Sequence, residues 1–211
     1  ERWAILKVFL VAAAVMIDPP FYDTPSWDEL QTHYSAVSDA VDIDIMYYNL
    51  PSATGVDLAP AQFAELARKT RVNSYKDTGG DAAKFASVLN HHAADITALN
   101  GWDTLSFAGL AAGAKASVWG TASVIPQPCA GFYDALAVRG GLVAARGLWA
   151  KIFPFCEFLE SHNYACAIKT GLELVGQDAG PTRRPVLPLA PEFRDEFRRL
   201  LVAAGVSVVE N

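Results

Sequence analysis

One lysine, Lys76, stands where a primary amine could do covalent chemistry. The residues before it, Val72 to Tyr75, are typical of a β-strand, and a Thr-Gly-Gly-Asp turn follows at 78–81. In parallel α/β folds, ligands bind at the carboxyl ends of the strands. An amine there, among apolar neighbours, is expected to be desolvated, which favours the neutral form that attacks a carbonyl carbon to give a Schiff base. The alternative is a strand-end lysine that points at water.

A tyrosine, Tyr48, ends a second strand-like stretch about one βαβ unit upstream of Lys76. This stretch begins at Ile43 and runs into the turn Asn49–Gly55. In a parallel sheet this tyrosine would lie at the same ligand-binding edge as Lys76. The alternative is a tyrosine that only packs within the sheet.

These two segments, with three others, resemble the dihydrodipicolinate synthase/N-acetylneuraminate lyase family. The resemblance runs from about Ala14 to the C-terminus, and its most specific parts are Tyr-Asn-Leu-Pro-Ser and Lys-Asp-Thr-Gly-Gly-Asp at their mutual spacing. Members of this family are class I, Schiff-base pyruvate aldolases and lyases on a (β/α)8 TIM barrel. The resemblance implies that fold, with a helical extension after the barrel. The three further segments are Ile17–Tyr22, Leu99–Asp103 and Gly180–Pro185.

The resemblance also implies roles for single residues. Lys76 matches the Schiff-base lysine, and Tyr48 matches the tyrosine that moves protons to and from the substrate. Tyr22 matches a tyrosine that reaches into the proton relay of a neighbouring subunit, although it could instead pack at a subunit interface. Gly101 and Val118 match positions that line the pyruvate pocket, with plain barrel packing as the alternative.

Two departures from the family pattern bear on the substrate. Ala53 stands where the dihydrodipicolinate synthases have an arginine that holds the carboxylate of the aldehyde substrate. A methyl group cannot clamp a carboxylate, which argues against a role in lysine biosynthesis. Trp119 and Ser123 stand where the family often has serine and asparagine. The Trp119 ring could narrow the pocket or stack on a sugar-like or aromatic aldehyde, or it could belong to the core.

The leading hypothesis is a lyase that acts through a lysine imine on pyruvate, or on a 2-keto acid that yields pyruvate, with an aldehyde as partner. A dehydratase of 2-keto-3-deoxy sugar acids could use the same imine. A non-catalytic relative that binds a keto acid is the alternative from another class. We expect no cofactor, and the family suggests a homodimer or homotetramer.

Composition excludes several other classes. With 52% hydrophobic and 19% charged residues, the 211-residue chain can bury a sizeable core. A net charge of −6 gives no basic stripe for nucleic acid. No apolar run reaches the roughly 18 residues that span a bilayer. His91 and His92 lack an acidic partner at ligand spacing, so we expect no metal. Three cysteines without CxxC spacing indicate reduced thiols and a cytoplasmic protein.

Strands and helices that alternate about every 25 residues predict a parallel sheet. After residue 119 only helical patterns remain, so we expect an incomplete barrel over residues 1–125 and the last barrel helix with a helical region over 126–211. The predicted strands are Ala14–Ile17, Ile43–Tyr48, Val72–Lys76, Asp95–Leu99 and Ala116–Trp119. The predicted helices are Ser26–Ser38, Pro60–Lys69, Ala82–His91, Thr104–Ala112, Gln127–Arg139, Val143–Leu159, Ala165–Leu174 and Pro191–Ala203.

Five strands cannot close an eight-stranded barrel, because strand number, tilt and shear are linked. Glu1–Lys7 looks like the helix after the family's second strand, and Ala14–Ile17 looks like the fourth strand. We therefore expect that strands one to three are absent from this sequence, with residues missing before Glu1 and a break in the chain between Lys7 and Ala14. The alternative is a natural five-stranded variant.

Overall fold

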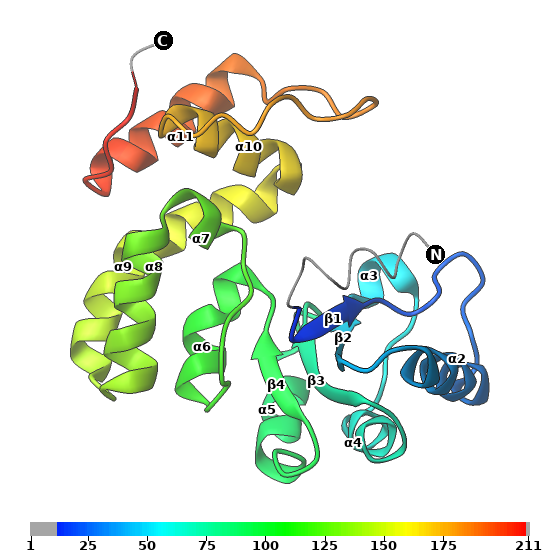
Figure 1. Ribbon diagram of the computed structural model, residues 1–211. Helices are drawn as coiled ribbons and strands as arrows, with labels where there is room; N and C mark the ends of the chain where they lie inside the picture. Colours follow the sequence, from blue (N-terminus) through cyan, green and yellow to red (C-terminus); the bar gives the residue numbers. More distant parts are fainter. Residues whose placement is uncertain (1–11, 210–211) are drawn as a thin grey trace. The chain divides into compact units, whose positions relative to one another are not determined.

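The computed structural model describes residues 12–209, and it divides the chain into two compact units (Figure 1). The first unit contains the residues up to Gly101 together with Ala114–Ala116. The second contains Trp102–Gly113 and the chain from Ser117 onward. The predicted boundary at residue 125 separates an incomplete barrel from the last barrel helix and the helical region. This boundary stays a prediction.

The first unit is built on a parallel sheet with the strand order β1-β2-β3-β4. The strands agree with four of the predicted ones to within two residues at each end. Because parallel strands must be joined by crossovers, a helix lies between each pair of strands in the sequence. The strands are β1 (Ala14–Ile17), β2 (Asp44–Asn49), β3 (Val72–Asp77) and β4 (Thr97–Asn100).

The fifth predicted strand, Ala116–Trp119, is wrong. Only a short remnant pairs with β4: the Lys115 N–H donates to the Ala98 carbonyl at 3.3 Å, and the Asn100 N–H donates to the Ala116 carbonyl at 3.0 Å. The remnant follows a turn at Gly113, which has φ of +107°. Within residues 12–209 the pairing goes no further, because the chain from Ser117 onward belongs to the second unit and not to the sheet.

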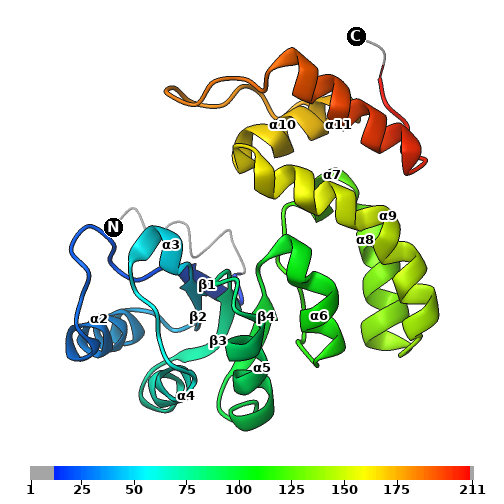
Figure 2. The same cartoon turned by 180° about the vertical axis from the view of Figure 1, so that it is seen from behind.

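Three helices cover one face of the sheet: α2 (Trp27–Ala40), α4 (Pro60–Lys69) and α5 (Ala82–His91) (Figures 1 and 2). Their predicted positions are confirmed, and α2 begins at the predicted capping box. The Ser26 hydroxyl accepts from the Glu29 N–H at 3.4 Å, and the Glu29 carboxylate accepts from the Ser26 N–H at 2.8 Å. A short helix that the sequence did not indicate, α3 (Pro51–Thr54), follows β2.

A continuous row of rings, here called the aromatic layer, packs these helices on the sheet. Consecutive ring centroids in this row lie 4.4–6.1 Å apart, which is the range of favourable aromatic contact. Each ring is 0–5% exposed. The aromatic layer is therefore the core of the first unit, and it consists of Tyr34, Tyr47, Phe63, Tyr75 and Phe85.

A register shift in β3 decides which side chains join the aromatic layer. Val72 pairs with Ile45, and Ser74 already pairs with the next residue, Met46, so Asn73 is an extra residue in β3. Side chains alternate between the two faces of a sheet, and one extra residue exchanges the faces for everything after it. Val72 and Tyr75 thereby lie on the same face, although they are three residues apart.

The second unit is helical, as the sequence predicts for the region after residue 119. Its buried core includes Ile152, Phe158, Leu174 and Phe197, and the rings of Phe158 and Phe197 stack 4.6 Å apart. The predicted helix over Gln127–Arg139 is divided into an α-helix and a π-helical turn. The elements are η1 (Asp103–Leu105), α6 (Ser106–Ala111), α7 (Thr121–Val124), α8 (Pro126–Tyr133), η2 (Asp134–Val138), α9 (Leu142–Ser161), α10 (Tyr164–Leu174) and α11 (Pro191–Ala203).

Some expectations concern the N-terminus. The helix over Glu1–Lys7 and most of the segment with the expected chain break lie outside the described residues.

In the part of the chain that is described, no helix has the length and apolar character needed to cross a membrane. All three cysteines are buried and free, in line with the predicted thiols, and burial raises the pKa of the Cys129 thiol to about 12.

Candidate active site

Lys76 and Tyr48 lie side by side at the carboxyl ends of β3 and β2. They are paired in the register of the sheet, and the Lys76 Nζ lies 4.1 Å from the centroid of the Tyr48 ring. Both side chains are half-buried, on the face of the sheet opposite the aromatic layer. The face of the ring lies against the lysine nitrogen, which keeps the amine next to the tyrosine. The proximity expected from the two strand ends is therefore present.

Gly101, at the end of β4, leaves the space that the lysine stem occupies. A Cβ on Gly101 would lie 2.7 Å from both Cγ and Cε of Lys76 and 2.5 Å from the Thr78 hydroxyl oxygen. Such distances are below van der Waals contact, so any larger residue would displace Lys76. The Gly101 N–H also donates to the Asp77 carbonyl at 2.7 Å, which fixes the glycine against β3.

The residues directly after Tyr48 and Lys76 form a buried polar pair that the sequence reasoning missed. The Asn49 amide donates from Nδ2 to Oδ1 of Asp77 at 2.6 Å, and the two residues are 1% and 9% exposed. Burial raises the pKa of the Asp77 carboxyl, although the hydrogen bonds from Asn49 and from the Gly79 N–H act in the opposite direction. The sequence gives only a partial signal: both residues are polar and stand at predicted strand ends, but nothing local indicates that they pair across 28 positions.

Among residues 12–209, no part of the chain encloses Tyr22. It lies in the loop after β1, and its side chain is 96% exposed. Both roles considered for it, a relay residue and an interface residue, require a neighbouring subunit. Both stay predictions.

Val118 and Trp119 belong to the second unit, whereas Lys76 belongs to the first. Val118 is 36% exposed. The Trp119 ring lies 6.1 Å from the Trp149 ring and 6.2 Å from the Phe132 ring, a contact that favours the packing alternative. Their roles as walls of a substrate pocket stay predictions.

The sequence reasoning also missed a buried carboxylate in the second unit, Asp103. Its Oδ2 accepts from the N–H and the hydroxyl of Thr121, at 3.0 and 2.7 Å, and its Oδ1 accepts from the Tyr164 hydroxyl at 2.7 Å. The Tyr164 oxygen in turn accepts from the Gly120 N–H at 2.7 Å. Asp103 thus ties the starts of η1, α7 and α10 together.

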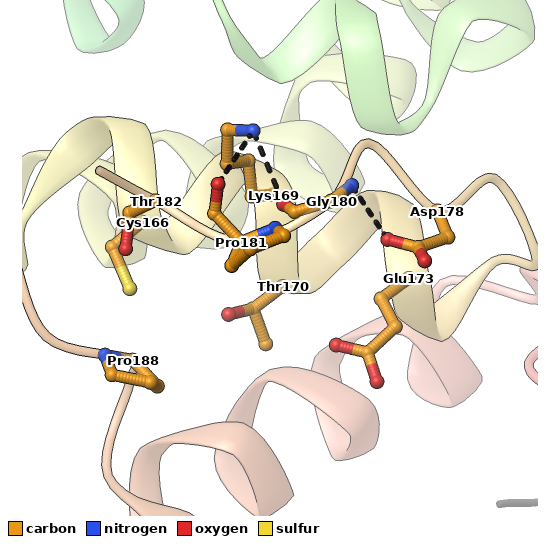
Figure 3. A pocket seen from close by; sticks show the side chains of 9 residues that line it. All are labelled: Cys166, Lys169, Thr170, Glu173, Asp178, Gly180, Pro181, Thr182 and Pro188. Carbon is orange, nitrogen blue, oxygen red and sulfur yellow. Dashed lines mark hydrogen bonds between the residues drawn. The ribbon is translucent and has the colours of Figure 1, made fainter.

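A second lysine, Lys169, lines a cavity of about 300 Å³ between α10 and the loop that follows it (Figure 3). Its ammonium group donates to the carbonyls of Ala179, Gly180 and Pro181 at 2.8–3.2 Å. Three carbonyl acceptors hold this nitrogen in place, so it is poorly placed to attack a keto carbon. Lys76 therefore remains the better candidate for imine chemistry. Within residues 12–209, no group of side chains is arranged to hold a metal ion.

The comparisons with known proteins agree with one another. A family model described as "Dihydrodipicolinate synthetase family" matches residues 10–204. The chain is 34% identical to a 4-hydroxy-tetrahydrodipicolinate synthase of Thermomicrobium roseum, over 92% of this chain and 63% of that protein. It is 32% identical to the enzyme of the same name from Rhodospirillum centenum, over 92% of this chain and 67% of that protein.

Solved structures show the same similarity. The chloride-inhibited dihydrodipicolinate synthase of Acinetobacter baumannii, in complex with pyruvate, superposes with a TM-score of 0.87 at 26% identity, over 93% of this chain and 67% of that one. Such structures are TIM barrels, and the predicted fold class is confirmed, although a closed barrel is not seen among residues 12–209. The chain spans about 63% of the length of the Thermomicrobium relative.

Proposed function

Because this chain belongs to the dihydrodipicolinate synthetase family, we propose that it is a class I lyase that forms an imine between Lys76 and pyruvate, or a 2-keto acid that yields pyruvate. The observation that carries the proposal is the Lys76 amine held 4.1 Å from the Tyr48 ring at the ends of adjacent strands. Support comes from the relatives' names and from a similar structure in complex with pyruvate.

The proposed reaction begins when the neutral Lys76 amine attacks the keto carbon. Loss of water from the adduct gives a protonated imine, which draws electrons from the neighbouring carbon. That carbon can then lose a proton and attack an aldehyde, or the reverse reaction can release one. The Tyr48 hydroxyl carries the protons to and from the reacting oxygens. Gly101 keeps the space beside the lysine stem open.

The alanine at position 53 restricts the class of aldehyde. Ala53 lies exposed in α3, beyond the end of β2, and its methyl group cannot hold a carboxylate. We therefore expect an aldehyde without that carboxylate. A dehydratase that acts on 2-keto-3-deoxy sugar acids through the same imine is the second candidate, because Lys76 and Tyr48 would serve it equally. A cytoplasmic homodimer or homotetramer completes the proposal.

Borohydride trapping tests the proposal directly. The chain is incubated with pyruvate, reduced and digested, and the peptide masses are compared with those of a Lys76→Arg variant. We expect the mass of one reduced pyruvate adduct on the peptide that contains Lys76, and none in the variant. An adduct confined to other lysines, or no adduct, would contradict the proposal and favour a non-catalytic binding protein.

A substrate panel then separates the two candidate reactions. Condensation of pyruvate with aldehydes consumes both compounds, whereas the dehydratase reaction converts a 2-keto-3-deoxy sugar acid into a product lighter by one water. Mass spectrometry of the small molecules distinguishes the two outcomes.

A further inference from the structure

The carboxyl ends of β2 and β3 are joined on the face opposite the Lys76 amine by a group of polar contacts that we call the strand-end clamp. Its members are Asn49, Asp77 and Gly79. The Asn49 Nδ2 donates to Asp77 Oδ1 at 2.6 Å, and the Gly79 N–H donates to the same oxygen at 3.1 Å. The Asn49 and Asp77 residues are paired in the register, one position beyond Tyr48 and Lys76.

The backbone around the clamp is fixed as well. The Thr78 N–H donates to the Asn49 carbonyl at 2.8 Å, and the Gly101 N–H donates to the Asp77 carbonyl at 2.7 Å. A Cβ on Gly79 would lie 3.0–3.1 Å from the Asp77 carboxylate and the Asn49 amide, so the turn is pressed against the pair. The ends of three neighbouring strands are therefore held together at the positions next to Lys76.

Stability alone does not explain a buried polar pair at this place. Asn49 Oδ1 is buried without a hydrogen-bond partner among residues 12–209, and Asp77 is 9% exposed. A buried polar atom without a partner costs free energy, and an apolar pair of similar volume often gives equal or greater stability. Burial of the clamp thus lowers the stability of the fold. Its directional hydrogen bond fixes the relative position of the ends of β2 and β3, which an apolar contact would not do.

We propose that Asn49 and Asp77 are positioning residues: their side-chain bond sets the distance between the Lys76 amine and the Tyr48 hydroxyl. This inference rests on the proposed function, since the geometry matters most if Lys76 forms the imine. Neither residue touches the substrate in the proposed reaction, because their side chains lie on the opposite face from Lys76 and Tyr48. Misplacement of a reacting group by about 1 Å can slow a reaction by up to about 10²-fold.

The test uses two variants and a matched control. Asn49→Asp places two carboxylates against each other and removes the only donor between the side chains. The double variant Asn49→Asp/Asp77→Asn exchanges the partners, so the amide now at position 77 can donate to the carboxylate now at position 49, while the amide oxygen still accepts from Gly79. Asn90→Asp makes the same chemical change at an exposed position of α5.

Two readouts are taken on the full chain, at a temperature well below the measured Tm of each variant. The first is the rate of trapping of Lys76 with pyruvate and borohydride. The second is the rate of acetylation of Lys76 by acetic anhydride relative to that of exposed Lys151 in the same molecule, which needs no pyruvate. We expect Asn49→Asp to lower the trapping rate by about 10- to 100-fold and to change the relative acetylation rate. The exchanged pair should restore most of both, and Asn90→Asp should change neither.

Several outcomes would overturn the inference. One is an unchanged acetylation ratio in Asn49→Asp, and another is a defect that the exchanged pair does not repair although its Tm recovers. If Asn49→Asp does not fold, Asn49→Ser, which shortens the side chain without adding charge, replaces it with the same criteria. If the wild-type chain traps no pyruvate, the proposed function fails, and the acetylation ratios alone decide on the clamp.

Discussion

The two faces of the β2–β3 pair have opposite properties, although their residues alternate in the sequence. On one face, Tyr47 and Tyr75 are 0–1% exposed within the aromatic layer, and burial raises the pKa of both phenols. On the other face, their immediate neighbours Tyr48 and Lys76 are half-buried and touch each other. The same residue type, tyrosine, therefore serves the core at position 47 and the candidate site at position 48.

The difference shows how a parallel sheet separates stability from chemistry. The aromatic layer fixes where the strands lie, because its rings are in contact from α2 through to α5. The side chains on the opposite face therefore lie at fixed spacing even though they are not tightly packed. We expect substitutions within the aromatic layer to change stability and substitutions of Tyr48 and Lys76 to change reactivity.

The largest effect is expected on removal of the amine. Lys76→Ala should abolish imine trapping with pyruvate, because β2 and β3 contain no other lysine. Its Tm should change little, since a half-buried side chain on the less packed face is lost. Lys151→Ala, at an exposed position of α9, is the control and should trap as the wild type does. Residual trapping in Lys76→Ala would place the nucleophile elsewhere.

The next effect compares the two neighbouring tyrosines through the same substitution. Tyr48→Phe should still form the imine but turn over about 10²- to 10⁴-fold more slowly, the usual loss for acid–base catalysis. Tyr47→Phe should leave turnover unchanged and stabilise the fold by up to about 1–3 kcal/mol. Its hydroxyl is buried without a hydrogen-bond partner among the described residues. Steady-state kinetics and chemical denaturation measure the two effects, and equal turnover in both variants would remove the relay role of Tyr48.

A third test probes the aromatic layer alone. Phe63 is 1% exposed and stacks on Tyr75 at 4.4 Å while its edge meets Tyr47 at 5.5 Å. Phe63→Ala should reduce the free energy of unfolding by about 3–5 kcal/mol, the cost of a large buried cavity. The imine should still form at temperatures where the variant is folded. Denaturant titration combined with trapping checks both points, and loss of trapping in the folded variant would show that the two faces are not separate.

The smallest effect concerns the pH dependence of stability. Burial raises the pKa of Asp77 above its ordinary value. A carboxyl with a raised pKa in the folded state contributes most below its ordinary pKa, and the contribution is lost as pH rises through the raised value. Asp77→Asn should therefore gain stability relative to the wild type over that rise, by at most about 1.4 kcal/mol per pH unit. Thermal unfolding from acid to neutral pH measures it, and a pH-independent difference would show that Asp77 has an ordinary pKa.

Much of the fold could be predicted from the sequence because the signals are local. The capping box at Ser26 and Glu29 and the prolines at the starts of α4 and α11 mark helix ends through contacts within one turn. The four strands likewise follow from β-branched and aromatic runs. The fifth strand fails because the chain from Ser117 onward belongs to the second unit and not to the sheet, and no local pattern marks where a segment leaves a sheet.

The candidate site was predictable where it depends on strand ends and not where it depends on side-chain pairing. Lys76 and Tyr48 meet because both occupy the last part of adjacent parallel strands. The strand ends could be read from the sequence, whereas the choice of these two residues as a site rested on the resemblance to the family. The bond between Asn49 and Asp77 joins residues 28 positions apart, so no local pattern announces it. For Trp119, the residue type does not distinguish a pocket wall from a core residue, because tryptophan occurs in both places.

Because Asn73 is an extra residue in β3, the face on which Lys76 lies depends on the number of residues before it as well as on their types. Without it, the residues after Val72 would exchange faces, and the Lys76 amine would point among the rings while Tyr75 pointed away from them. A single-codon deletion could therefore inactivate the protein while every functional residue remains in the gene. Alignment of relatives around Lys76 accordingly has to preserve the length of the segment from Val72 to Lys76, since a gap there has more consequence than a substitution.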